Sequence, residues 1–65
     1  MPEDTIANKI RKIRYLNGLS QMEFAKKIGK IDITVSQWER ELFKPNITSK
    51  TLIIKIFNLP KNYFD

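Results

Sequence analysis

The 65-residue sequence contains no cysteine and no histidine. The chain therefore has no disulfide, no Cys/His metal site, no thiol nucleophile and no imidazole for acid–base catalysis. No apolar run approaches the ~20 residues that a membrane-spanning helix needs, and the start of the chain lacks the charged region of a signal peptide. These absences disfavour an enzyme, and we expect one intracellular domain over residues 1–65, without a cofactor.

Positive charge is in excess, because twelve Lys and Arg residues face seven Asp and Glu residues and leave a net charge of +5. A small basic domain suits a polyanionic partner such as nucleic acid, because neutralising phosphates releases counterions. The same excess serves solubility alone in many small proteins. Charge by itself leaves both interpretations open.

Hydrophobic spacing predicts a first helix over Thr5–Asn17, with Asp4 or Thr5 as N-cap and a stop at Asn17 and Gly18. A second helix is predicted over Gln21–Ile28, because Ser20 and Glu23 have the spacing of a capping box. The expected apolar faces of these two helices consist of Ile6, Ile10, Ile13 and Leu16, and of Phe24, Ala25 and Ile28.

A third helix is expected from Asp32, as its N-cap, to about Glu41, with Val35, Trp38 and Leu42 inward. A fourth is expected over about Ser49–Phe57, and Pro60 opens a final turn that ends in Tyr63 and Phe64. The N-cap of the fourth helix is one of Asn46, Thr48 and Ser49, and its apolar face is Leu52, Ile53, Ile56 and Phe57.

The second and third helices are separated by only three or four residues around Gly29, so they must cross steeply. If Val35 and Trp38 point inward, the polar side chains at the start of the third helix point outward. A short exposed helix of this kind fits a major groove about 12 Å wide. The outward residues are Asp32, Ile33, Thr34, Ser36 and Gln37.

The segments Leu19–Gly29, Thr34–Arg40 and Lys44-Pro45 resemble the Cro/phage-repressor (XRE-type) helix-turn-helix family. The resemblance extends to Ile10–Arg14 and Leu59–Phe64. It implies an all-α, lambda-repressor-like domain of five helices, of which four are main helices and the last is a short C-terminal turn. The helix-turn-helix would span about residues 21–41, and the partner would be double-stranded DNA.

The resemblance also assigns roles to individual residues. Among the base readers, Gln37 can pair with adenine, and Ile33 and Thr34 can touch a thymine methyl. Asp32 either caps its helix, which we favour, or accepts a hydrogen bond from cytosine. The base-reading set is Asp32, Ile33, Thr34, Ser36 and Gln37; the phosphate-binding set is Gln21, Arg40 and Lys44; and Arg14 and Glu39 form a structural, partly buried ion pair.

Three positions depart from the family pattern. Lys30 stands where the turn is usually apolar, so Ile31 is expected to turn inward in its place. The first residue of the third helix is therefore defined only to within about one position. Glu41 replaces a frequent glycine and predicts an extra helical turn. Lys50 and Thr51 replace frequent leucines and predict a late start of the fourth helix or a shift in its register.

The expected function is a transcriptional repressor of phage, plasmid or mobile-element type in the bacterial cytoplasm. It would bind a palindromic operator as a homodimer, without a small-molecule ligand or a membrane. The alternative is a protein-interaction module, antitoxin-like or a regulatory subunit, with Leu42, Phe43, Tyr63 and Phe64 jointly exposed. The chain also fits the N-terminal part of a longer repressor. Residues 9–12 are expected to form a solvated basic face with a secondary role at phosphates.

Overall fold

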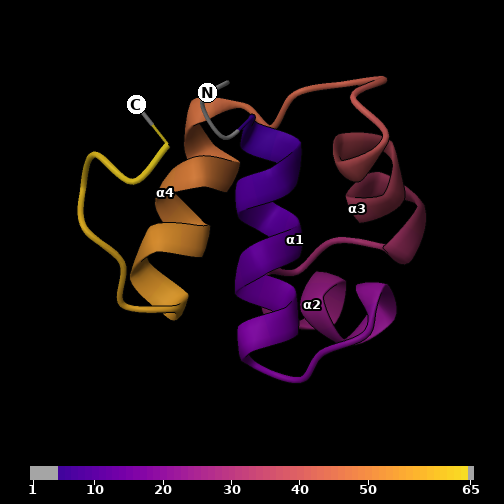
Figure 1. The fold of residues 1–65 in the computed structure, drawn as a ribbon, viewed down its shortest axis with the longest axis horizontal. Helices are drawn as coiled ribbons and strands as arrows, with labels where there is room; N and C mark the ends of the chain where they lie inside the picture. The colour runs from indigo at the N-terminus through magenta and orange to yellow at the C-terminus, as the bar shows by residue number, and fades with distance from the viewer. Residues whose placement is uncertain (1–4, 65) are drawn as a thin grey trace.

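The computed structural model describes residues 5–64, and all regular structure in this range is helical. In Figure 1, α1 (Ile6–Leu16) lies between two groups of elements. On one side are α2 (Gln21–Lys27) and α3 (Asp32–Glu39), and on the other are α4 (Ile47–Ile56) and the C-terminal segment. The all-α prediction is confirmed, although this range has four helices and not five, and the predicted C-terminal turn lies over residues 61–64. In the described range, no helix is long and apolar enough to span a bilayer.

Side-chain caps fix where three of the helices begin. The Oγ1 of Thr5 accepts from the Asn8 amide at 3.1 Å, whereas the alternative cap Asp4 lies outside the described residues. Ser20 and Glu23 form the predicted capping box, with bonds of 3.1 and 2.8 Å. Asn46 caps α4, so this helix begins at Ile47 and the predicted late start is wrong.

The start of α3 differs from the prediction. Ile31 is the N-cap, no side chain caps the helix, and Asp32 is its first residue. The expected capping role of Asp32 is therefore wrong, although a carboxylate in the first turn still suits the helix dipole. Ile31 does not turn inward either, because 62% of its surface is exposed.

All four helices of the described range end in the same hydrogen-bonding pattern, a Schellman motif. At the end of α3, the Leu42 amide donates to the Gln37 carbonyl at 3.0 Å and the Glu41 amide to the Trp38 carbonyl at 3.2 Å. Glu41 takes the left-handed conformation with φ 61°, so the predicted extra turn is wrong. The residues in this position are Gly18, Gly29, Glu41 and Asn58.

The core lies where α1, α2, α3 and α4 meet. The rings of Phe24 and Phe57 stack there, with centroids 5.2 Å apart. Ile53 is the buried centre of the α4 face, and Ile54 packs beside it. The buried hydrophobic cluster comprises Ile10, Ile13, Phe24, Ala25, Ile28, Val35, Trp38, Ile53 and Phe64.

Three of the expected core positions are exposed instead. Leu16 is 80% exposed because it lies about 90° around the helix from the stripe of Ile10 and Ile13. Ile56 is 43% exposed because it flanks the α4 face that Ile53 and Phe57 define. Leu42 lies beyond the end of α3 and is 55% exposed.

Candidate nucleic-acid interface

Helix α3 has one buried face and one exposed face. Val35 is fully buried and Trp38 is 5% exposed, so these two side chains anchor the helix from beneath. On the outer side, Ile33 is 59% exposed and Asp32 is exposed, whereas the side chains of Thr34, Ser36 and Gln37 are half-buried.

The helical period explains how these residues are grouped. At 100° per residue, Asp32, Ile33, Ser36 and Gln37 fall within an arc of about 140°, and Thr34 lies on its flank. Short, mixed polar and apolar side chains on one arc of a firmly packed helix can reach base edges in a major groove. The structure therefore brings the predicted base-reading residues to one side of α3.

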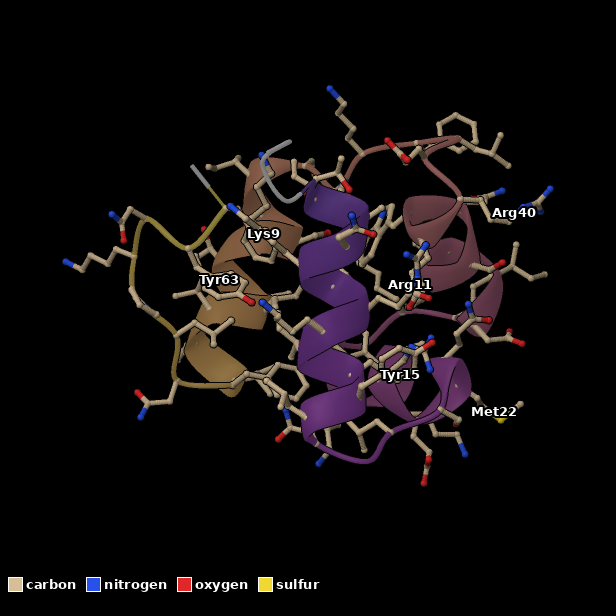
Figure 2. The ribbon with its side chains drawn as sticks, viewed as in Figure 1. Lys9, Arg11, Tyr15, Met22, Arg40 and Tyr63 are labelled. Carbon is tan, nitrogen blue, oxygen red and sulfur yellow. The ribbon has the colours of Figure 1, made fainter. Side chains whose placement is uncertain are left out.

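The predicted phosphate-binding residues occupy different surroundings. Arg40 and Lys44 are exposed, and Figure 2 shows Arg40 on the side of α3 that faces away from α1. Gln21, the first residue of α2, is half-buried, and its Nε2 donates to Oε1 of Glu39 at 3.3 Å. One amide hydrogen of Gln21 is thus directed inward, toward the carboxylate, and a second remains on the same nitrogen.

Glu39 is the acceptor at the centre of a buried cluster. Arg14 donates from Nε to Oε2 and from Nη2 to Oε1, each at 2.8 Å. The side chain of Glu39 is only 4% exposed and that of Arg14 is 12% exposed. The structure therefore brings together the two residues for which the resemblance implied an ion pair.

Two opposing effects act on the pKa of Glu39. Burial disfavours the charged carboxylate and would raise this pKa. The hydrogen bonds from Arg14 and Gln21, with the positive charges of Arg14 and Arg11, outweigh burial and hold the pKa below its ordinary value. The hydrogen bond to Glu39 in turn raises the pKa of the Arg14 guanidinium. Glu39 is thus ionised at neutral pH, and the cluster is a charged one.

Sequence reasoning missed that Arg11 belongs to this cluster. It was expected on a solvated face, but its Nη2 donates to the main-chain oxygen of Glu39 and its Nε lies 3.5 Å from Oε1. In Figure 2, Arg11 lies between α1 and α3. The available signal was its spacing, because residues three apart on a helix share a face and Arg11 precedes Arg14 by three.

Lys9, from the same basic run, also has an internal partner. Its Nζ donates to the main-chain oxygen of Tyr63 at 2.8 Å and lies 5.8 Å from the centre of the Tyr63 ring. Figure 2 shows this pair on the opposite side of α1 from Arg11. The expectation that residues 9–12 form a purely solvated face is therefore wrong for Lys9 and Arg11.

The surface expected for a protein-interaction module is not formed as a unit. Leu42 and Phe43 are 55% and 62% exposed, but Phe64 is 7% exposed and packs into the core. Tyr63 is half-buried, and its ring is perpendicular to that of Phe64, with the ring centroids 5.2 Å apart. The prediction that all four side chains are exposed together is therefore wrong. In the described residues, no group of three or more Asp and Glu side chains could hold a metal ion.

The comparison with protein families supplies an independent line of evidence. A family model described as helix-turn-helix matches residues 10–64 of the chain. The chain belongs to the Cro/C1-type (XRE) helix-turn-helix family. Comparisons with curated proteins and with solved structures gave no significant match. Members of this family are DNA-binding regulators, so the protein is a DNA-binding helix-turn-helix regulator.

Proposed function

We propose that the protein is a sequence-specific transcriptional repressor that binds a palindromic operator in double-stranded DNA as a homodimer. The observation that supports this proposal best is the exposed outer arc of α3 above the buried Val35 and Trp38. A repressor of this kind needs no chemistry, since the bound protein blocks access of the polymerase to the promoter.

The base contacts are assigned to the outer arc of α3, formed by Asp32, Ile33, Ser36 and Gln37, and to Thr34 on its flank. The Gln37 amide pairs with an adenine, a contact worth about 1–3 kcal/mol of discrimination. Ile33 and Thr34 contact thymine methyl groups, and Ser36 adds a hydrogen bond. Asp32 does not cap the helix, so its carboxylate is available to accept from the amino group of a cytosine.

The phosphate contacts flank this arc. Arg40 and Lys44 follow α3 and bind the backbone through their charges, and the remaining amide hydrogen of Gln21 donates to a phosphate at the start of α2. These contacts fix the orientation of α3 in the groove without reading the sequence. Each neutralised phosphate also releases counterions, so binding weakens as salt is added.

Dimerisation follows from the small size of the module. A single domain buries too little surface on DNA for strong discrimination, whereas two copies on half-sites about 34 Å apart double the contacts. Phage, plasmid or mobile-element genes in a bacterial cytoplasm are the proposed setting, and no cofactor or small-molecule ligand is part of the proposal.

The test begins by selecting preferred duplexes from a random DNA pool. Affinity is then measured by fluorescence anisotropy for the selected and a scrambled duplex over a range of salt concentrations. We expect a preference for the selected duplex and a steep loss of affinity with salt. Equal affinity for both duplexes, or no dependence on salt, contradicts the proposal.

Two substitutions test the assigned roles against each other. Gln37→Ala should relax the preference for one base pair, while Arg40→Ala should weaken all duplexes alike and reduce the salt slope by about one. Lys61→Ala is the matched control, because Lys61 is exposed on the C-terminal segment, across α1 from α3 (Figure 1). If Gln37→Ala and Arg40→Ala bind like the control, the site assignment is wrong.

A further inference from the structure

Helix α3 is the only one of the four described helices without a basic residue in its last turn. The last turn of a helix has unpaired carbonyl groups and partial negative charge, which a nearby cation stabilises. The Schellman motif uses the carbonyls of Gln37 and Trp38. The carbonyl of Glu39, the last residue of α3, needs a donor from elsewhere.

Arg11 on α1 provides both the cation and the donor. Its Nη2 donates to the Glu39 carbonyl, its Nε lies 3.5 Å from the Glu39 carboxylate, and its Nη1 donates to Oδ1 of Asn8 at 2.8 Å. The guanidinium is a rigid planar group, so contacts from all three of its nitrogens, two to Glu39 and one to Asn8, hold it in one orientation.

The contact of Arg11 differs in kind from that of Arg14. Arg14 holds the side chain of Glu39, and a side chain can rotate while its helix shifts. Arg11 holds the main chain of Glu39 and therefore the end of the helix itself. Two fixed points on one residue restrict both the position and the tilt of α3.

We propose that Arg11 is a positioning residue for the recognition helix: it ties the C-terminal end of α3 to α1 and sets the angle at which the outer arc meets the bases, without touching DNA. This inference rests on the proposed DNA reading by α3. It replaces the expectation that Arg11 is a solvated cation with a secondary role at phosphates. The fold itself depends less on Arg11, because its side chain is 37% exposed while that of Arg14 is 12% exposed.

The experiment compares Arg11→Lys, Arg11→Met and the control Lys61→Met in full-length protein. Affinities for the selected and scrambled duplexes are measured over a range of salt, at a temperature where circular dichroism shows each variant to be fully helical. Arg11→Lys keeps the charge but replaces the planar guanidinium by one ammonium nitrogen on a flexible stem, so it cannot hold the Glu39 carbonyl and Asn8 in one fixed orientation. We expect the affinity ratio between the two duplexes to fall by about threefold to tenfold in Arg11→Lys, with an unchanged salt slope.

Arg11→Met should reduce the ratio at least as much, and its binding to scrambled DNA should match that of Lys61→Met, because both lose one charge. If Arg11→Met weakens both duplexes equally and lowers the salt slope by about one more than the control does, Arg11 contacts phosphate and the inference is wrong. If Arg11→Met fails to fold, the affinity ratio of Arg11→Lys tests the inference by itself.

The outcome also separates this inference from the proposed function. A wild-type protein without preference for any duplex overturns the proposed function, and this inference with it. A wild-type protein that discriminates, with an unchanged ratio in Arg11→Lys and Arg11→Met, overturns only the role of Arg11.

Discussion

Arg14 and Glu39 face each other through two hydrogen bonds of equal length, 2.8 Å from Nε to Oε2 and 2.8 Å from Nη2 to Oε1. This fork joins the last turn of α1 to the last residue of α3. Gln21 at the start of α2 donates to the same carboxylate. Three helices therefore meet at one side chain, and the placement of α3 depends on it.

Removing either partner of this ion pair should destabilise the fold strongly. A buried charge without its partner costs about 3–5 kcal/mol, which is a large share of the roughly 3–10 kcal/mol expected for a domain of this size. We expect Glu39→Met to cost more than Arg14→Met, because Arg11 and Gln21 still contact the carboxylate in Arg14→Met. Urea unfolding in a stabilising osmolyte measures both.

The double variant Arg14→Met with Glu39→Met is the control for this prediction. Since it leaves less uncompensated charge in the cluster, it should be more stable than Glu39→Met alone. A double variant whose loss equals the sum of the two single losses would show that the two side chains act independently.

Stability should fall in acid through the same carboxylate. In the folded protein the pKa of Glu39 lies below its ordinary value of 4.5, so the folded state favours the ionised form. The resulting stability is complete above about pH 4.5 to 5, and it is lost as the pH falls through the folded-state pKa. Urea midpoints measured from pH 7 to pH 2 should show this decline.

Two variants test whether the loss of stability in acid comes from Glu39. The pKa of Glu23 is also lowered, first by the hydrogen bond from the Ser20 amide and then by its hydroxyl. We expect Glu39→Gln to flatten the pH dependence markedly and Glu23→Gln to leave most of it. The assignment to Glu39 is wrong if both variants keep the full slope.

Glycine at position 41 should stabilise the protein. Glu41 holds φ at 61°, a conformation that costs an L-residue about 1–2 kcal/mol and glycine nothing. After the greater chain entropy of glycine is subtracted, Glu41→Gly should gain about 0.5–1 kcal/mol. Thermal unfolding measures the gain, and Glu41→Ala, which keeps the Cβ, should show little of it.

Gly29→Ala should show the same effect with the opposite sign. A Cβ at position 29 would meet no atom within 4 Å, so its cost is one of backbone conformation alone at φ 71°. We expect a loss of about 1 kcal/mol. A neutral result at both positions would mean that the left-handed residue is not a significant source of strain here.

Local chemistry made much of this fold predictable. The capping box at Ser20 and the glycines at positions 18 and 29 act within one turn of the chain, so the ends of α1 and α2 could be derived from neighbouring residues. Glu41 was misjudged because the Schellman bonds of α3 force a left-handed residue at that position whatever its side chain.

The candidate site was harder to predict in full. The exposure of α3 follows from the inward spacing of Val35 and Trp38, which the sequence displays. The role of Arg11 depends on Glu39, which is 28 positions away in the sequence. The two residues come into contact only when α1 packs against α3, and local sequence patterns do not reveal this packing. The same holds for Lys9 and Phe64, which meet other elements only after the chain has closed.

The position of the C-terminal segment has a practical consequence. Phe64 is buried in the core and Lys9 holds the carbonyl of Tyr63, so this stretch is fixed on the α4 side of α1, across from α3 (Figure 1). A dye or a biotin tether attached to the exposed Lys61 of this segment therefore stands away from α3. Protein immobilised in this way should present α3 to duplexes in the surrounding solution.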